Sequence, residues 1–128
     1  MKKIMTLIAA AFVATSVYAG EFPDISIADL KKAIADKKVV VVDVMGSASY
    51  KKGHVPTAID FATAKKDFAK SLPADKNALI VAYCGGPTCS AYKAAATAAE
   101  KLGYKNIKHM SAGISGWLAA KEVTEPGK

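Results

Sequence analysis

The sequence predicts an α/β fold of three layers, in which helices cover both faces of a central, mostly parallel sheet. Two segments, residues 39–44 and 78–83, are almost wholly apolar, which is typical of parallel strands that are buried on both faces. Helical patterns alternate with strand patterns along the chain, and this order favours a parallel sheet. A length of 128 residues and a hydrophobic fraction of 52% fit one domain with a packed core.

The first predicted helix begins at Ser26. Ser26–Asp29 resembles a capping box with an acidic third position, and Lys37-Lys38 ends the helix before the strand 39–44. The remaining predicted elements are, in order, a turn over 46–52 with helical character, a short strand 58–60, a helix 63–70, the strand 78–83, an Ala-rich helix 90–102, a strand 106–110 and a last helix that follows the turn 111–113.

The ends of these elements also carry signals. Gly103 is expected to stop the Ala-rich helix in a left-handed conformation. His109 is expected to lie on the surface at a strand end, and the tail from Thr124 is expected to be frayed. The residues expected to anchor the helices in the core are Phe61, Ala64, Phe68 and Trp117.

Residues 1–19 have the pattern of a secretory signal peptide. Two lysines precede an almost wholly apolar run over 4–17, and Val17-Tyr18-Ala19 places small residues where a signal peptidase reads. Cleavage there would leave residues 20–128 as a single domain, either periplasmic or secreted. The run is too short for a comfortable membrane span, so a stable membrane anchor is not expected, and an uncleaved anchor is the alternative.

The chain contains no arginine, and all 18 of its basic residues are lysines. Lysine offers a point charge, whereas the flat guanidinium group of arginine binds phosphate and carboxylate through two hydrogen bonds. This composition disfavours a phosphatase with an arginine-bearing loop and a DNA-binding protein that reads bases. The net charge of +7 comes from scattered lysine pairs rather than one stripe, so nucleic acid is not an expected partner.

The loop Cys84–Ser90 follows the strand 78–83 directly, and sites in open parallel sheets form at the carboxyl ends of strands. Its amides and the start of the next helix are expected to form an anion cradle that stabilises a Cys84 thiolate. Cys84 is therefore the predicted nucleophile, and the alternative is a small buried apolar residue. The predicted anion- or persulfide-binding residues are Gly85, Gly86, Thr88, Cys89 and Ser90.

Four segments stand in a specific order along the chain. They are Val42-Asp43-Val44, Gly53–Ala58, Tyr83–Ser90 and Gly113–Trp117. In this order and spacing, which spans residues 25–120, they resemble the rhodanese-like domain family, the single-domain sulfurtransferases of the thiosulfate type. The four segments are similar to the family's Asp-Val-Arg strand, its Gly-His turn, its active-site loop and its C-terminal Gly-and-Trp segment.

The resemblance implies a rhodanese-like α/β fold and a sulfurtransferase. Cys84 would take a sulfane sulfur from a small donor (thiosulfate, polysulfide or a persulfide), and a thiol acceptor would then remove it from the Cys84 persulfide. No organic cofactor is implied, and the histidines and cysteines lack the spacing of a metal site. Asp43 and His54 are expected to be structural residues near the site, with catalysis by His54 as the alternative.

Two positions depart from the family pattern near the sulfur. Met45 stands where the family usually has the arginine of Asp-Val-Arg, and Cys89 stands near a second family arginine, late in the loop. Both cations that would assist an anionic donor are missing, so we predict weak use of thiosulfate. Thr57 and Ala112 replace usual glycines in turns. The lysines that are candidates for the mouth of the site are Lys51, Lys52 and Lys93.

Cys89 leaves three functions open. As a resolving thiol it could attack a Cys84 persulfide, release sulfide and leave a disulfide. The chain would then be a redox or sulfur-carrier protein. It would need a reductant, for which another protein is a candidate. As an inert cysteine it would leave a plain sulfurtransferase. A non-catalytic rhodanese-like binding module is the third possibility. A disulfide between the two cysteines would close a very small loop and stabilise little.

Overall fold

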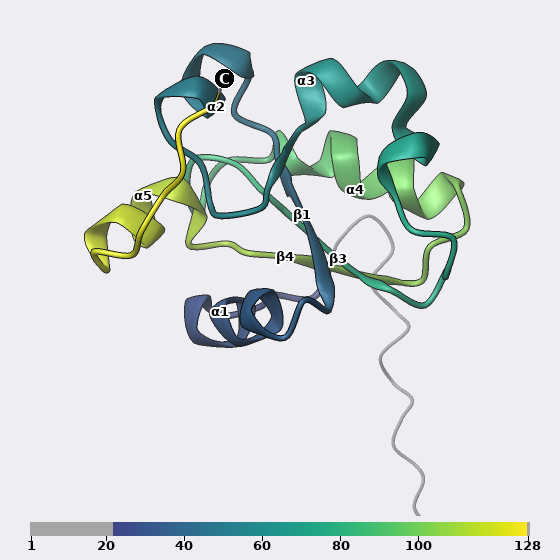
Figure 1. The fold of residues 1–128 in the computed structure, drawn as a ribbon, viewed down its shortest axis with the longest axis horizontal. Coiled ribbons are helices and arrows are strands. Elements are labelled where there is room, and N and C mark those ends of the chain that lie inside the picture. Colours follow the sequence, from purple (N-terminus) through teal and green to yellow (C-terminus); the bar gives the residue numbers. More distant parts are fainter. Residues whose placement is uncertain (1–21, 128) are drawn as a thin grey trace, which may run out of the picture.

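The computed structural model describes residues 22–127 and contains one sheet of four strands with helices on both sides (Figure 1). The elements in chain order are α1 (Ile27–Ala35), β1 (Val39–Asp43), α2 (Ser47–Lys52), β2 (Ile59–Asp60), α3 (Phe61–Ala64), the 3₁₀ helix η3 (Lys65–Ser71), β3 (Leu79–Tyr83), α4 (Tyr92–Lys101), β4 (Asn106–His109) and α5 (Gly113–Ala119). The predicted signal peptide, residues 1–19, lies outside the described residues. Among the described helices, none is long and apolar enough to cross a membrane.

The strands are all parallel and lie in the order β2-β1-β3-β4. Asp43 at the end of β1 pairs with Tyr83 at the end of β3, and Ala82 pairs with His109 at the end of β4. The carboxyl ends of these strands therefore meet at one edge of the sheet, where sites form in open parallel sheets. The predicted α/β fold with a parallel central sheet is confirmed.

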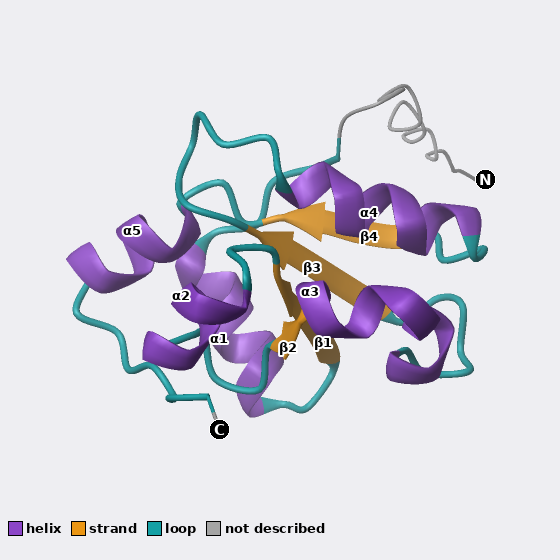
Figure 2. Cartoon of the chain, turned by 90° about the horizontal axis from the view of Figure 1, so that it is seen from above, coloured by secondary structure: helices purple, strands orange, loops and turns teal. Residues whose placement is uncertain are grey.

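Each face of the sheet is covered by its own helices (Figures 1 and 2). On one face, Val41 shares a buried cluster with Leu30 of α1 and Trp117 of α5. On the other face, Val42 shares a second cluster with Ala96 of α4 and with residues of α3 and η3. Successive residues of a strand point to opposite faces, so β1 is apolar along its length because both of its faces are covered. Trp117 is a core anchor, as predicted.

Two local signals in the sequence are confirmed. The hydroxyl oxygen of Ser26 accepts a hydrogen bond from the amide of Asp29 at 3.0 Å and caps α1. Gly103 follows the last residues of α4 with a φ of +99°, which is the left-handed region that glycine adopts without a steric penalty.

The predicted helix 63–70 is wrong in its form. The chain forms one turn of α-helix, α3, and then continues as η3, with a break at Asp67 where φ is −147° and ψ is 59°. Phe61 and Phe68 are both buried and meet edge to face at 5.0 Å between ring centroids, whereas Ala64 is half-buried. Nothing in the spacing of the apolar residues marks the break at Asp67.

The helix predicted to start at Ser90 begins later, at Tyr92. The amides of Lys93 and Ala94 bond to carbonyls three residues earlier, at 3.0 Å each. Bonds of this length in sequence form a tighter, 3₁₀-type turn at the end of the loop Cys84–Ser90, and the α-helical hydrogen bonds follow this turn.

The expectation of a frayed tail is also wrong. The amide of His54 donates to the carbonyl of Glu125 and the amide of Glu125 donates to the carbonyl of His54, both at 2.9 Å. The amide of Gly127 then donates to the carbonyl of Lys51 at 3.1 Å. Backbone pairing of this kind leaves no trace in side-chain patterns, so the sequence could not indicate it.

Candidate active site at the carboxyl edge of the sheet

Cys84 is the first residue after β3, as predicted, and only 1% of its surface is exposed. Its carbonyl accepts a hydrogen bond from the amide of Ile114 at 2.9 Å, and the carbonyl of Gly85 accepts one from the amide of Ser115 at 3.0 Å. Amides in the first turn of a helix have no partner inside that helix. The first turn of α5 therefore holds the start of the cysteine loop in place.

Close contact between α5 and the loop explains a glycine of the Gly-and-Trp segment. Gly113 has a φ of +66°, and a Cβ atom there would lie 2.5 Å from the carbonyl carbon of Gly85 and from the nitrogen of Gly86. A Cβ on Gly86 would lie 3.0 Å from the hydroxyl oxygen of Ser115. Glycine at 113 is thus required both by its backbone conformation and by the backbone that faces it.

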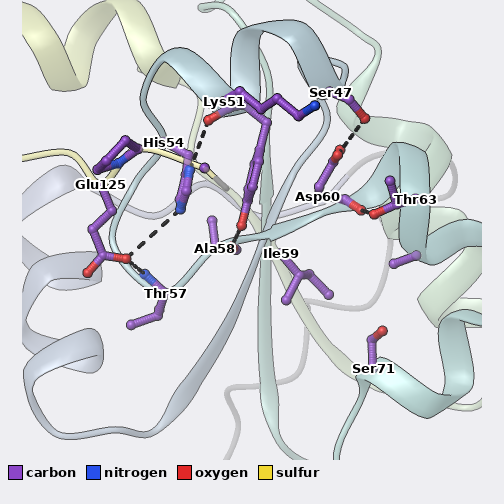
Figure 3. A pocket seen from close by; sticks show the side chains of 14 residues that line it. Ser47, Lys51, His54, Thr57, Ala58, Ile59, Asp60, Thr63, Ser71 and Glu125 are labelled. Atoms are coloured by element: carbon purple, nitrogen blue, oxygen red, sulfur yellow. Dashed lines mark hydrogen bonds and ion pairs between the residues drawn. The ribbon is translucent and has the colours of Figure 1, made fainter.

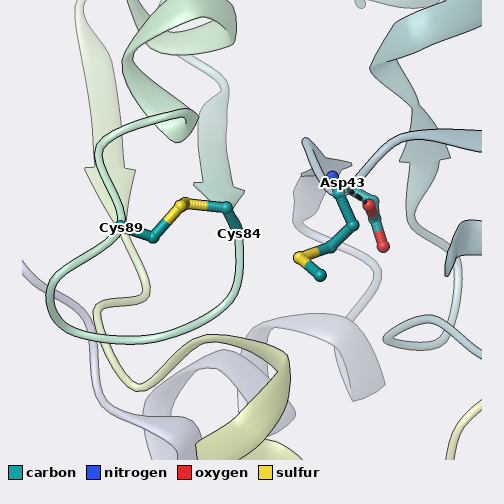
Figure 4. Close-up of a disulfide and its surroundings, with 4 residues drawn as sticks. Asp43, Cys84 and Cys89 are labelled. Atoms are coloured by element: carbon teal, nitrogen blue, oxygen red, sulfur yellow. Dashed lines mark hydrogen bonds between the residues drawn. A yellow bond between two sulfur atoms is a disulfide. The ribbon is translucent and has the colours of Figure 1, made fainter.

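Cys84 and Cys89 are joined by a disulfide, with their Cα atoms 6.3 Å apart (Figure 4). This separation lies inside the range of about 4.4–6.8 Å that disulfides require. The sequence left open whether the two cysteines pair, and in this structure they do. The amide of Cys89 donates to the carbonyl of Gly86 at 3.1 Å. In this closed form the Cys89 amide is used within the loop, and the anion cradle around Cys84 stays a prediction.

Of the two positions at which the family usually has arginine, Cys89 is in this loop and Met45 lies two residues after the end of β1. Met45 packs against both buried clusters, one of which contains Cys84, and its amide donates to a carboxylate oxygen of Asp43 at 2.7 Å. Of the three candidate lysines, Lys93 lines a cavity together with Cys89. Lys52 lines a small cavity together with Met45, and Lys51 lines the cavity around His54.

Asp43 holds the ends of two strands and a turn together. The hydroxyl of Tyr83 donates to Asp43, and the amide of Val55 donates to the Tyr83 oxygen at 3.0 Å. Burial raises the pKa of Asp43, against the lowering effect of its hydrogen bonds. Burial and the hydrogen bond to Asp43 raise the pKa of Tyr83. These contacts fit the structural role that the sequence predicts for Asp43.

His54 contacts Tyr50 and Glu125 through its ring, and Figure 3 shows its approach to Glu125. Its Nδ1 lies 3.0 Å from the carbonyl oxygen of Tyr50, its ring stacks on the Tyr50 ring at 3.8 Å, and its Nε2 lies 3.9 Å from a carboxylate oxygen of Glu125. The cavity around it measures about 730 Å³ and includes Asp60 and Ser47 in its wall, and neither cysteine is among its described lining residues. The geometry fits a structural His54 rather than a catalytic one.

His109 is not on the surface, and its placement corrects the sequence interpretation. Only 8% of it is exposed, its ring stacks on Tyr92 with centroids 3.4 Å apart, and its Nε2 has no hydrogen-bond partner within residues 22–127. Burial lowers its pKa, with Lys93 acting in the same direction and Asp24 against it. His109 lines a cavity of about 310 Å³ that also includes Cys89.

One signal could have found His109. The sequence predicts a parallel strand that ends beside it, and the carboxyl end of that strand must share an edge with the end of β3 and hence with Cys84. Its burial beneath Tyr92 has no such signal. Within the described part of the chain, no group of three or more histidine, cysteine or carboxylate side chains is placed to hold a metal ion.

Comparison with known proteins identifies relatives of this arrangement. Residues 26–120 match the model of the rhodanese-like domain. The crystal structure of a protein from Bacillus halodurans is 30% identical, with a TM-score of 0.61, and covers 81% of this chain and 77% of that one. No curated protein matches the sequence.

Two sulfurtransferases share the fold at lower identity. A thiosulfate sulfurtransferase from Pseudomonas aeruginosa is 22% identical with a TM-score of 0.69, and the match covers 98% of this chain and 25% of that one. A human single-domain sulfurtransferase is 17% identical with a TM-score of 0.62, and the match covers 76% of this chain and 96% of that one.

Proposed function

The chain belongs to the rhodanese-like domain family, and from this premise we propose that it is an exported sulfurtransferase that moves sulfane sulfur through a persulfide on Cys84. The observation that carries the proposal is the position of Cys84, directly after β3 and in a loop whose first carbonyls are fixed by α5. The sulfur donor and the thiol acceptor follow from the family's chemistry. Export, to the periplasm or the medium, rests on the signal-peptide pattern of residues 1–19.

The proposed reaction starts from the reduced protein, because the sulfur of Cys84 is held in the disulfide. The Cys84 thiolate attacks the sulfane sulfur of the donor, and the donor's sulfur–sulfur bond breaks. The leaving group departs with the electron pair, as sulfite when the donor is thiosulfate, and Cys84 carries a persulfide. An acceptor thiolate then attacks the outer sulfur and leaves with it, which restores the Cys84 thiolate.

The donor class follows from the charges around the site. Thiosulfate carries two negative charges, and Met45 supplies no cation near the loop. Lys93 is placed beside Cys89, on the outer side of the disulfide. A persulfide carries one negative charge and releases a monoanionic thiolate, and a polysulfide spreads its charge over a longer, softer sulfur chain, so we favour these donors over thiosulfate.

A second function is favoured by the disulfide itself. In the reduced protein the Cys89 thiolate could attack the inner sulfur of a Cys84 persulfide, so that a Cys84–Cys89 bond forms and hydrosulfide leaves. The pair would then act as a redox or sulfur-carrier couple, and each cycle would need two electrons from a thiol reductant. A Cys89→Ala variant that releases sulfide at the wild-type rate would refute this second function.

The proposal is tested by sulfur transfer from two donors to cyanide, with thiocyanate as the measured product. The reduced protein is expected to turn over with polysulfide and only weakly with thiosulfate. No transfer from either donor would contradict a sulfurtransferase, and family-typical efficiency with thiosulfate would contradict the donor assignment.

Met45 provides a matched pair of variants for the donor assignment. Met45→Arg restores the cation and should raise the rate with thiosulfate by about tenfold, the effect of one charged hydrogen bond. Met45→Leu keeps the apolar packing and should leave the ratio of the two donor rates unchanged. Equal ratios in both variants would show that charge at this position does not select the donor.

A further inference from the structure

The two sulfurs of the disulfide are not equally accessible. Cys84 is 1% exposed and belongs to the buried cluster between the sheet and α4, whereas Cys89 is partly exposed and lines the cavity of about 310 Å³. Thiol–disulfide exchange requires a thiolate to approach the sulfur that it attacks, so access decides which sulfur reacts. Cys89 is therefore the more accessible of the two residues, whereas Cys84 is covered in this closed form.

The cavity beside Cys89 has the charge to attract an anion. Among the described residues that line it, Lys93 is the one charged side chain. Asp24 acts electrostatically on His109, but its carboxylate accepts a hydrogen bond from the amide of Ser111 at 2.9 Å and does not line the cavity. A ligand with a carboxylate would therefore meet a cation and no opposing acid at this wall.

His109 supplies a second and independent indication of a ligand. Buried polar atoms in proteins are nearly always hydrogen-bonded, yet Nε2 of His109 has no partner within residues 22–127. The ring is fixed by its stacking on Tyr92 and belongs to the wall of the same cavity. Because burial lowers its pKa, the ring is neutral near neutral pH and one nitrogen can accept a proton.

We propose that this cavity, which we call the Cys89 cavity, binds a small anionic thiol that attacks the sulfur of Cys89 and thereby frees Cys84. The proposal deepens the proposed function, on which it rests for its purpose: it names the partner that opens the disulfide and the sulfur that is attacked. Lys93 attracts the carboxylate of the thiol, and the neutral His109 ring in the cavity wall takes up the thiol's proton as the thiolate forms.

The step balances in electrons and atoms. The incoming thiol gives its proton to His109, the thiolate forms a bond to the Cys89 sulfur, the Cys84–Cys89 bond breaks, and Cys84 leaves with the electron pair as a thiolate. A second thiolate attacks the incoming sulfur of the mixed disulfide, which releases Cys89 as a thiolate and yields the oxidised form of the small thiol. Two thiols thus supply the two electrons, and the residue that is freed first is the predicted nucleophile.

The site of attack is tested by trapping the mixed disulfide. The oxidised protein is mixed with 3-mercaptopropionate and excess iodoacetamide, quenched in acid and mapped by fragment-ion mass spectrometry. We expect mercaptopropionate on Cys89 and the alkyl group on Cys84. The reverse assignment would overturn the proposal.

The charge of the thiol is tested with three probes of similar size, compared at equal thiolate concentration. These are 3-mercaptopropionate, neutral 2-mercaptoethanol and cationic cysteamine. Lys93→Gln should slow opening by 3-mercaptopropionate by about two- to fivefold, as for a partly exposed charge pair, leave 2-mercaptoethanol unchanged and speed cysteamine. Lys101→Gln, at the far end of α4, is the control and should change none of the rates. A Lys93→Gln variant that alters all three probes alike, or none, would refute the anionic specificity.

His109 is tested by His109→Phe, which keeps a ring against Tyr92 and removes both nitrogens. We expect slower opening with all three probes and the mixed disulfide still on Cys89. Unchanged rates would remove His109 from the proposal. None of these measurements involves a persulfide. The proposed sulfur transfer can therefore fail while the attack on Cys89 is confirmed, and the attack on Cys89 can fail while sulfur transfer is confirmed.

Discussion

The regions around the two histidines are built alike and differ in one respect. His54 stacks on Tyr50 at 3.8 Å with an angle of 3° between the rings, and His109 stacks on Tyr92 at 3.4 Å with an angle of 4°. His54 has a hydrogen-bond partner for one nitrogen and a carboxylate near the other. Nε2 of His109 has no partner among the described residues, and this histidine is the one that shares a cavity with a cysteine.

This difference separates structural polar groups from groups that are available for chemistry. Around His54 the polar atoms are paired with the tail at Glu125, and the neighbouring Asp43 and Tyr83 bond to each other. Such groups hold the carboxyl edge of the sheet in shape. Cavity size alone would point to His54, which lines the larger of the two cavities. Unsatisfied hydrogen-bonding capacity beside a sulfur is the better guide here.

The largest expected effect comes from replacing the nucleophile. Cys84→Ser should abolish sulfur transfer from polysulfide to cyanide, because no persulfide can form at serine. Its midpoint in urea should lie only somewhat below that of the reduced wild-type protein, because a buried serine hydroxyl costs more to desolvate than a thiol. Sulfur transfer by Cys84→Ser at the wild-type rate would contradict the view that the region of Cys84 carries the chemistry and the region of His54 is structural.

Replacing Asp43 is expected to affect stability rather than sulfur transfer. Asp43→Ala leaves the hydroxyl of Tyr83 and the amide of Met45 without their acceptor in a buried place, and should lower the free energy of unfolding by about 3 kcal/mol. Asp43→Asn keeps an acceptor oxygen and should cost about 1 kcal/mol or less. Urea unfolding of the two variants measures the difference. Equal losses would show that packing, and not hydrogen bonding, is what Asp43 supplies.

The buried His109 should make stability depend on pH. Because burial lowers the pKa of His109, the unfolded chain binds a proton that the folded protein does not as the pH falls below about 6.5, and stability falls with pH in that range. His109→Asn removes this term, so the wild type should lose more of its free energy of unfolding than the variant between about pH 7 and pH 5. Unfolding curves for both proteins at these pH values measure the difference. Equal losses of the free energy of unfolding in the two proteins would show that His109 is not buried in its neutral form.

The smallest expected effect lies in the turn beside His54. Thr57 has a φ of +72°, a left-handed conformation that strains a β-branched residue. Thr57→Gly should relieve that strain and raise the free energy of unfolding by about 1 kcal/mol, and the amide bonded to Glu125 is retained. Thr63→Gly, inside α3, is the matched control and should lower the free energy of unfolding by about 1 kcal/mol. A loss in both variants would mean that the turn is not strained.

The sequence predicts the sheet well because both faces of β1 and β3 are covered, and this makes the two strands apolar throughout. It also places Cys84, since the position follows from where a strand ends. It could not predict the pairing of Glu125 with His54, which uses only backbone atoms, or the break in the helix at Asp67. The cavity at Cys89 was missed for another reason: it depends on Tyr92 covering His109, a contact between two elements that no local pattern records.

The most direct test of the account is the mass of the reduced Cys89→Ala variant after exposure to polysulfide and removal of the excess. With Cys89 absent, a persulfide formed on Cys84 has no neighbouring cysteine to attack it. The account predicts one added sulfur atom, located on Cys84 by fragment ions and removed by cyanide. A variant that stays at its starting mass while its Cys84 thiol is free would contradict the claim that Cys84 carries the sulfur.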